Sequence, residues 1–123
     1  MISVLVVDDY PALRKLLVEY LRTCPRLQVV GEAKNGLEAI EMAKSKRPQV
    51  IVMDVRMPVL DGISVTRVIK ERWPEIVVIS YSGDQAPEVA REAKAAGAAL
   101  HLTKPLNLEE LAARIQELVA VLA

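Results

Sequence analysis

Several charged residues in this sequence stand where short apolar runs end, and their types suit the chemistry of a cation and an anion. Asp8 and Asp9 follow the first run, Asp54 follows one in the middle of the chain, and Lys104 follows the last. Carboxylates at the ends of buried strands are costly to hold there without a cation. A lysine is a natural partner for the anion that such a site handles. These residues would form one site if the fold brings them together.

The apolar runs alternate with helical patterns five times along the chain. The expected strands cover residues 2–7, 27–30, 50–53, 76–80 and 98–102. The expected helices begin near Pro11, Asn35, Asp61, residue 85 and the N-cap Asn107. The fourth helix, over residues 85–96, has few large apolar side chains, so we expect it to be weakly anchored. Strands that are apolar on both faces favour a parallel sheet with helices on both sides.

The expected sheet places the charged residues at one edge. In sheets of this kind ligands bind beyond the carboxyl ends of the strands, where the strand order reverses. Each of the four residues lies at or just beyond such an end. The order of the residues along the chain therefore predicts that they converge in space.

Three gathered carboxylates would not stay ionised without compensation. Two like charges about 4 Å apart repel by roughly 4 kcal/mol at an effective dielectric constant near 20. Ligands that are all oxygen favour Mg²⁺ over zinc, and Mg²⁺ is commonly completed by phosphate oxygens. Lys104 would add a second positive charge, and an aspartate can itself be the nucleophile in phosphoryl transfer. The set therefore indicates Mg²⁺-dependent phosphoryl chemistry.

Each of these residues also has an ordinary interpretation when taken alone. Asp8 or Asp9 could cap a helix, Asp54 could belong to a turn, and Lys104 could be solvated. Ser80, at the end of the fourth expected strand, could be only a small polar residue. Their coincidence at successive strand ends favours the functional interpretation.

The composition narrows the remaining classes of protein. The 123 residues suit one domain, and the 16 basic and 16 acidic residues cancel. Nothing therefore points to general attraction to nucleic acid or to an anionic membrane. Cys24 is the single cysteine, so no intramolecular disulfide can form. No apolar stretch reaches membrane-spanning length and no signal peptide is evident, so we expect a cytoplasmic protein.

The sequence resembles the receiver domain of bacterial two-component response regulators. The matching segments run along the whole chain in the usual order and spacing: residues 6–9 (VVDD), 54–62 (DVRMPVLDG), 77–80 (VVIS), 96–98 (AGA) and 104–105 (KP). The resemblance implies a single domain over residues 1–123 with a flavodoxin-like, doubly wound α/β fold. It also implies a five-stranded parallel sheet in the order 2-1-3-4-5.

The resemblance assigns a metal role to the acids. Asp9 and Asp54 would bind Mg²⁺ directly, together with the backbone carbonyl of Arg56, and Asp8 would act through a water molecule. None of these ligand assignments follows from the spacing of the residues alone.

The resemblance also assigns the phosphoryl chemistry and the switch. Asp54 would be the phosphoacceptor, Lys104 would pair with it and then with its phosphoryl group, and Ser80 would give a hydroxyl hydrogen bond to a phosphoryl oxygen. The bond between Lys104 and Pro105 would be cis. Ser80 would move inward on phosphorylation, followed by the side chain at His101, where the family usually has an aromatic residue.

The implied function is that of a phosphorylation-activated switch rather than a turnover enzyme. The phosphoryl group would come from a sensor histidine kinase or a phosphotransfer protein of a phosphorelay. Phosphorylation would reshape the surface of the fourth helix, fifth strand and fifth helix, which would control a downstream protein or an output domain, or form a homodimer. Residues 28–36 resemble receivers attached to DNA-binding domains, but this segment itself has no DNA-reading element.

Three positions depart from the family pattern. His101 could simply pack, or it could give a weaker or pH-sensitive switch. Tyr81 follows Ser80, where a small residue is usual, so its ring could hinder water or a partner and slow the loss of phosphate, or it could point to solvent. Arg56 could reach the phosphate or Asp84, although we favour a solvated side chain.

Two other classes of protein remain as alternatives. A small Mg²⁺-dependent phosphatase or phosphotransferase with an aspartyl nucleophile usually has Asp-x-Asp after the first strand, whereas Asp8 and Asp9 are adjacent. A flavodoxin-like nucleotide or flavin binder would need a glycine-rich phosphate loop there, and the sequence after residue 7 has none. Continuous release of phosphate from general monoesters would indicate the phosphatase.

Overall fold

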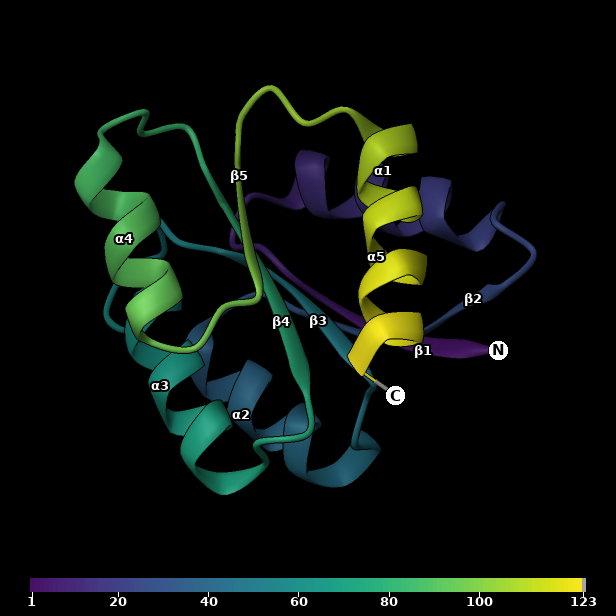
Figure 1. Cartoon of the computed structure of the whole chain (residues 1–123), viewed down its shortest axis with the longest axis horizontal. Coiled ribbons are helices and arrows are strands. Elements are labelled where there is room, and N and C mark those ends of the chain that lie inside the picture. The colour runs from purple at the N-terminus through teal and green to yellow at the C-terminus, as the bar shows by residue number, and fades with distance from the viewer. Residues whose placement is uncertain (123) are drawn as a thin grey trace.

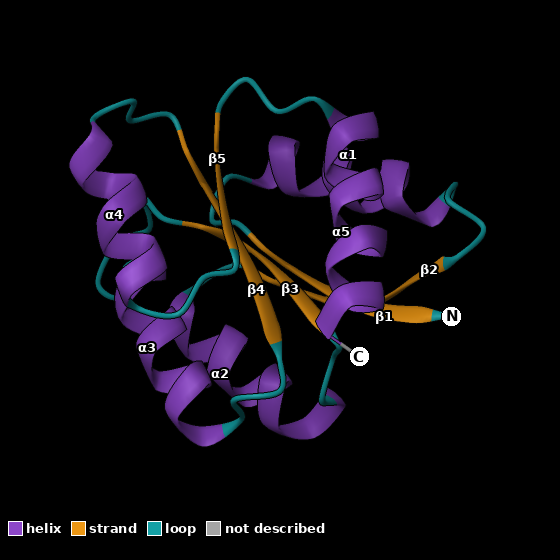
Figure 2. Cartoon of the chain, viewed as in Figure 1, coloured by secondary structure: helices purple, strands orange, loops and turns teal. Residues whose placement is uncertain are grey.

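Five parallel strands form one twisted sheet in the order β2-β1-β3-β4-β5, and five helices cover its two faces (Figures 1 and 2). The computed structural model describes residues 1–122, so Ala123, the last residue of the predicted domain, lies outside the described residues. The strands are β1 (Ile2–Val7), β2 (Leu27–Ala33), β3 (Val50–Asp54), β4 (Val77–Ser82) and β5 (Leu100–Thr103). The helices are α1 (Pro11–Arg22), α2 (Gly36–Lys46), α3 (Gly62–Arg72), α4 (Pro87–Ala95) and α5 (Leu108–Leu122). The fold class and the strand order are as predicted.

Alternating side chains of the sheet build two separate cores. In Figure 1, α1 and α5 lie on one side of the sheet and α2, α3 and α4 on the other. Val4 and Val6 point into the first core with Leu17 of α1 and Leu111 of α5. Leu5 and Val7 point into the second, which includes Ala39, Ile69 and Ala93. Burial on both faces explains why β1, β3 and β4 read as continuous apolar runs.

The edge strands differ most from the predicted boundaries. β2 was expected to end at residue 30, but it continues to Ala33 because it stays paired with β1 up to Val7. Gly31 and Glu32 interrupt the apolar pattern on this edge strand, which is why the sequence understates its length. β4 extends two residues beyond the prediction to Ser82, while β5 begins at Leu100 rather than residue 98.

Side-chain caps fix where the helices near the site begin. The Asn35 Oδ1 accepts a hydrogen bond from the Glu38 amide at 2.8 Å, and the Asp61 Oδ1 accepts one from the Ser64 amide at 2.9 Å. Asn107 accepts from the Glu110 amide at 2.9 Å, which confirms it as the N-cap of α5. In the described part of the chain, no helix combines the length and apolar character needed to cross a membrane.

Gly62 joins the start of α3 closely to the end of β3. A Cβ atom at this position would fall on the backbone carbonyl of Asp54. The Gly62 amide donates to the Val55 carbonyl at 2.9 Å. The position of Asp54 is therefore tied to the first turn of α3.

The fourth helix is held loosely compared with its neighbours. Ala93 is its one buried residue in the described structure, and Val89 packs partly against the core. The helix begins at Pro87 rather than at residue 85. Proline suits the first position of a helix, because the N–H that it lacks would have no partner within the helix there. Its shallow burial agrees with the weak anchoring expected from the sequence, whereas its mobility stays a prediction.

Candidate functional site

The predicted acids meet at the carboxyl ends of β1 and β3. Asp8, Asp9 and Asp54 each place one carboxylate oxygen within 4.8 Å of the others. Asp8 and Asp54 are buried, and Asp9 is half-buried. Residues separated by more than 40 positions in the chain therefore form one cluster, as the order of the strands predicted.

Asp8 lies at the centre of a set of hydrogen bonds. Its Oδ1 accepts from the Tyr10 amide at 2.8 Å, and its Oδ2 accepts from the Tyr81 hydroxyl at 2.6 Å. Arg14 Nη1 donates to the Asp8 backbone carbonyl at 2.8 Å. The bonds from Tyr10 and Tyr81 satisfy a carboxylate that is fully buried and fix its orientation, while Arg14 holds the backbone of Asp8.

Asp54 sits beside both a negative and a positive neighbour. Its Oδ1 accepts from the Arg56 amide at 3.2 Å and lies 3.7 Å from Lys104 Nζ. Burial, and next the charge of Asp8, raise the pKa of Asp54 to about 7, although Lys104 and the Arg56 amide act in the opposite direction. The clustered acids thus repel one another more than Lys104 compensates, and the cluster favours a further positive charge.

The donor set suits a hard divalent cation. The clustered ligand atoms are all carboxylate oxygens, which is the chemistry that Mg²⁺ prefers. The hydrogen bond from the Arg56 amide to Asp54 places the Arg56 backbone next to the acids. The role of the Arg56 carbonyl as a ligand, and that of water at Asp8, stay predictions.

Lys104 approaches the cluster from the end of β5. Its amide donates to the Ser82 carbonyl at 2.8 Å, and the peptide bond to Pro105 is cis, as the resemblance implied. The ammonium lies 5.4 Å from the centre of the Tyr81 ring as well as close to Asp54. Lys104 therefore lies where it could meet an anion bound at Asp54.

Ser80 and His101 are partners on adjacent strands. They are paired in the register of β4 and β5, and the Ser80 Oγ lies 2.7 Å from His101 Nδ1. Burial, and next the charge of Lys94, lower the pKa of His101 and favour its neutral form. His101 thus contacts the hydroxyl that was predicted to meet the phosphoryl group, and its role in the switch stays a prediction.

Tyr81 points into the molecule rather than toward solvent. Its side chain is fully buried in the core beneath α1 and α5, and its hydroxyl reaches Asp8. The alternative of a solvent-facing ring is therefore wrong, while an effect on phosphate loss stays a prediction. The hydrogen bond spans 73 positions, so no local pattern could reveal it, but a buried tyrosine hydroxyl does require some partner.

Arg56 forms an ion pair with Asp84, which was one of the two contacts considered for it beside the favoured solvated side chain. Its guanidinium nevertheless remains exposed, with 65% of the side chain accessible. The Asp84 Oδ1 also accepts from the Ala86 amide at 2.9 Å, and these two contacts, the backbone one foremost, lower the pKa of Asp84. The pair links the loop after β3 to the loop between β4 and α4.

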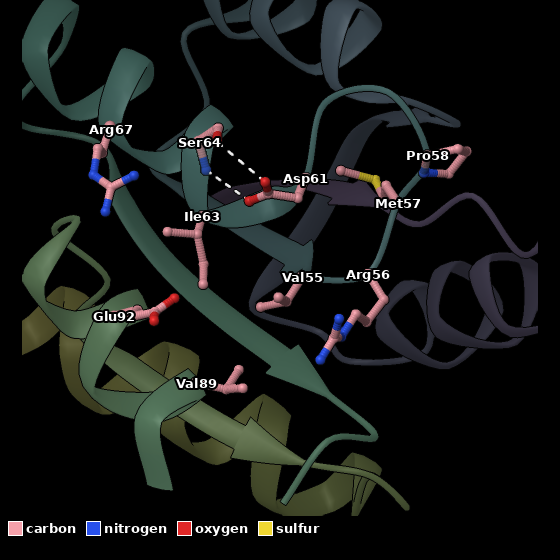
Figure 3. A pocket seen from close by; sticks show the side chains of 10 residues that line it. All are labelled: Val55, Arg56, Met57, Pro58, Asp61, Ile63, Ser64, Arg67, Val89 and Glu92. Atoms are coloured by element: carbon pink, nitrogen blue, oxygen red, sulfur yellow. Dashed lines mark hydrogen bonds between the residues drawn. The ribbon is translucent and has the colours of Figure 1, made fainter. Parts of the chain in front are cut away.

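A cavity of about 530 Å³ lies between the loop after β3, α3 and α4, and its lining includes Val55 and Arg56, the two residues that follow Asp54. Figure 3 shows Asp61 bonded to Ser64 on its wall, and Arg67 and Glu92 on the two helices that flank it. None of Asp8, Asp9, Asp54 and Lys104 lines it. The cavity was not predicted, because its walls combine the motif over residues 54–62 with side chains of α3 and of α4, and α4 is distant in the sequence.

Comparison with known proteins gives a consistent family. The model of the response regulator receiver domain matches residues 4–116. A protein-glutamate methylesterase/protein-glutamine glutaminase of Myxococcus xanthus is 42% identical over 109 residues, which are 88% of this chain and 31% of that protein. One of Pseudoalteromonas atlantica is 42% identical over 121 residues, covering 98% of this chain and 31% of that protein. The chain thus spans about a third of the length of these relatives.

Solved structures agree with the sequence matches. The response regulator domain of Thermotoga maritima CheB has a TM-score of 0.85 and 36% identity, over 98% of this chain and 94% of that one. The receiver domain of NarL from Mycobacterium tuberculosis has a TM-score of 0.92 and 30% identity, over 97% and 96%. An aspartyl phosphatase is not favoured by these findings. The chain belongs to the response regulator receiver domain family of two-component signalling.

Proposed function

We propose that this receiver takes a phosphoryl group onto Asp54 from the phosphohistidine of a sensor histidine kinase or phosphotransfer protein. The observation that carries the proposal is the placement of Asp54, which lies buried between two further acids and 3.7 Å from Lys104 Nζ. Burial and the charge of Asp8 leave this carboxylate poorly stabilised until a cation joins the site.

The chemistry requires little more than position and charge. An oxygen of Asp54 attacks phosphorus, the bond between phosphorus and the histidine nitrogen breaks, and the electron pair leaves with the imidazole. Lys104 neutralises negative charge on the phosphoryl oxygens. Asp8 and Asp9 would hold Mg²⁺ with Asp54, and the ion, when bound, would neutralise charge on the carboxylates and the phosphoryl group.

Ser80 would carry the event away from the site. Its hydroxyl would turn to a phosphoryl oxygen, which changes its hydrogen bond with His101 on β5. The phosphoryl group thereby favours one of two arrangements of the surface formed by α4, β5 and α5. Shallow burial of α4 supports this direction of change, and a phosphorylation-dependent homodimer through the same surface stays a prediction.

The receiver would regulate an output rather than catalyse turnover. Its relatives are named as methylesterases and glutaminases, and this chain matches about a third of their length. We therefore place any such activity in an output domain or a separate protein that the receiver controls. The cytoplasmic location and the absence of direct nucleic-acid binding stay predictions.

The proposal is tested by incubating the protein with acetyl phosphate and Mg²⁺ and measuring its intact mass. We expect a gain of one phosphoryl group, which Asp54→Asn abolishes. Asp61→Asn is the matched control, because asparagine also caps a helix and should preserve both the fold and the reaction. Unchanged labelling of Asp54→Asn, or steady hydrolysis of a general phosphate monoester, would contradict the proposal.

A further inference from the structure

We propose that Tyr81 is a positioning residue of the cation and phosphoryl site, with its hydroxyl holding Asp8 and its ring face holding Lys104. The inference rests on the proposed function, since it assigns Tyr81 a role toward the same acids.

The first observation is the hydrogen bond between the Tyr81 hydroxyl and Asp8. At 2.6 Å it has the length of a hydroxyl donating to a carboxylate. The Tyr10 amide donates to the other oxygen at 2.8 Å, so each oxygen of Asp8 receives one donor. Each oxygen then keeps a second acceptor position for a cation or its water. The carboxylate plane is therefore fixed before any cation binds.

Second, Tyr81 is itself held in place by the burial of its ring and by the pairing of its backbone. Its ring is fully buried among the side chains beneath α1 and α5. Its backbone pairs with Asp54 across β3 and β4, and its carbonyl accepts from the Val55 amide at 2.9 Å. The hydroxyl is thus held at a fixed distance from the backbone of the phosphoacceptor.

The third observation concerns Lys104. Its ammonium lies 5.4 Å from the centre of the Tyr81 ring, within the range of a cation–π contact. The same ammonium lies 3.7 Å from Asp54 Oδ1. Tyr81 therefore contacts Asp8, a predicted metal ligand, through its hydroxyl. Through its ring it contacts Lys104, the positive charge that is predicted to pair with the phosphoryl group.

Two effects of the hydroxyl oppose each other. A donor on Asp8 withdraws negative charge, which weakens attraction to a cation, but it also fixes the carboxylate in one orientation. Groups that orient metal ligands in this way typically change metal affinity by about 10–100-fold when removed. Because Asp8 is fully buried and has a donor on each oxygen, we expect the orientation effect to prevail.

The test compares Mg²⁺ affinity in the wild-type protein and two variants by titration calorimetry. Tyr81→Phe keeps the buried ring but removes the hydroxyl, and should raise the Kd for Mg²⁺ about tenfold. Tyr20→Phe is the matched control, a half-buried tyrosine on α1 whose loss of hydroxyl should leave the Kd unchanged within about twofold. Thermal unfolding of each metal-free variant shows whether it folds, and the affinities are compared between folded proteins.

Kinetics with acetyl phosphate separates positioning from a general loss of structure. Tyr81→Phe should need about tenfold more Mg²⁺ for half-maximal phosphorylation, yet reach the wild-type rate when Mg²⁺ saturates, since the variant keeps Asp54, Lys104 and the ring. Tyr81→Leu, which lacks the ring as well, should also lose maximal rate because Lys104 is no longer supported.

An unchanged or tighter Mg²⁺ affinity in Tyr81→Phe would overturn the inference, as would an equal loss in Tyr20→Phe. Failure of the proposed function would look different, because the wild-type protein would then bind Mg²⁺ without accepting a phosphoryl group on Asp54.

Discussion

The hydroxyl oxygen of Ser80 and the Nδ1 of His101 lie 2.7 Å apart on the neighbouring strands β4 and β5. A serine hydroxyl has one proton to donate. It cannot donate that proton to the histidine ring and to a phosphoryl oxygen at the same time. The bond therefore competes with the phosphorylated state, or reverses its direction so that the ring becomes the donor.

Replacing His101 should release the serine. His101→Phe keeps an aromatic ring but offers no acceptor, so beryllofluoride with Mg²⁺, a phosphoryl mimic, should bind about 2–10-fold more tightly, which corresponds to one neutral hydrogen bond. The binding constant is measured by titration of backbone amide signals. In a Ser80→Ala background the same replacement should have no effect. Weaker binding by His101→Phe would show that the histidine assists the active state.

Asp54 should destabilise the metal-free fold at neutral pH. Its pKa of about 7 lies above the value near 4 of an unfolded chain, so between these values the folded chain binds more protons. The free energy of unfolding must then fall as the pH rises through this window and level off above it. Asp54→Asn should therefore be more stable than wild type by about 2–4 kcal/mol near pH 8, and by much less near pH 4.

This prediction is measured by urea unfolding across the pH range in the absence of divalent ions. Asp61→Asn serves as the control at an exposed cap and should keep the wild-type pH dependence. A constant difference between Asp54→Asn and wild type at all pH values would contradict the assignment.

Added Mg²⁺ should stabilise the wild-type fold. Binding to the folded state alone contributes about 3 kcal/mol at a hundredfold excess over the Kd. Protons and cations compete for Asp54, so the effect should be larger near pH 8 than near pH 6. Thermal unfolding with and without Mg²⁺ measures it. Asp9→Asn should lose most of this stabilisation. If Mg²⁺ raised the unfolding temperature of Asp9→Asn as much as that of the wild type, the acid cluster would be excluded as the Mg²⁺ site.

The junction at Gly62 should tolerate no side chain. Gly62→Ala would place a methyl group on the Asp54 carbonyl, so we expect a loss of more than about 3 kcal/mol in urea unfolding. Gly31→Ala is the control, because its Cβ would meet only the flexible side chains of Leu5 and Met42 at 3.4 Å. That variant should change stability by less than about 1 kcal/mol. Equal effects at the two positions would show that the backbone near Asp54 can move.

Much of the fold could be predicted because the sheet is buried on both faces. Continuous apolar runs located β1 and β3 almost to the residue, and the order of strands followed from the family resemblance. The extension of β2 through Gly31 and Glu32 could not be predicted, since backbone pairing at an edge strand does not require apolar side chains.

The acid cluster was also predictable, because the carboxyl ends of parallel strands lie at one edge of the sheet. The roles of the neighbouring side chains were not. Tyr81 turns inward because it occupies a position of β4 that is buried, and its hydroxyl bonds to Asp8, 73 positions away and just beyond the end of β1. Arg56 pairs with Asp84 because the loops after β3 and β4 adjoin, which no local pattern encodes.

The central claim is that Asp54 alone accepts the phosphoryl group, and the most direct test maps the modified residue. The protein is treated with acetyl phosphate and Mg²⁺, reduced with borohydride, and digested for peptide sequencing, because reduction converts an aspartyl-phosphate to homoserine. We predict homoserine at position 54 and at no other acid. Homoserine at position 8 or 9, or its absence from position 54, would contradict the account.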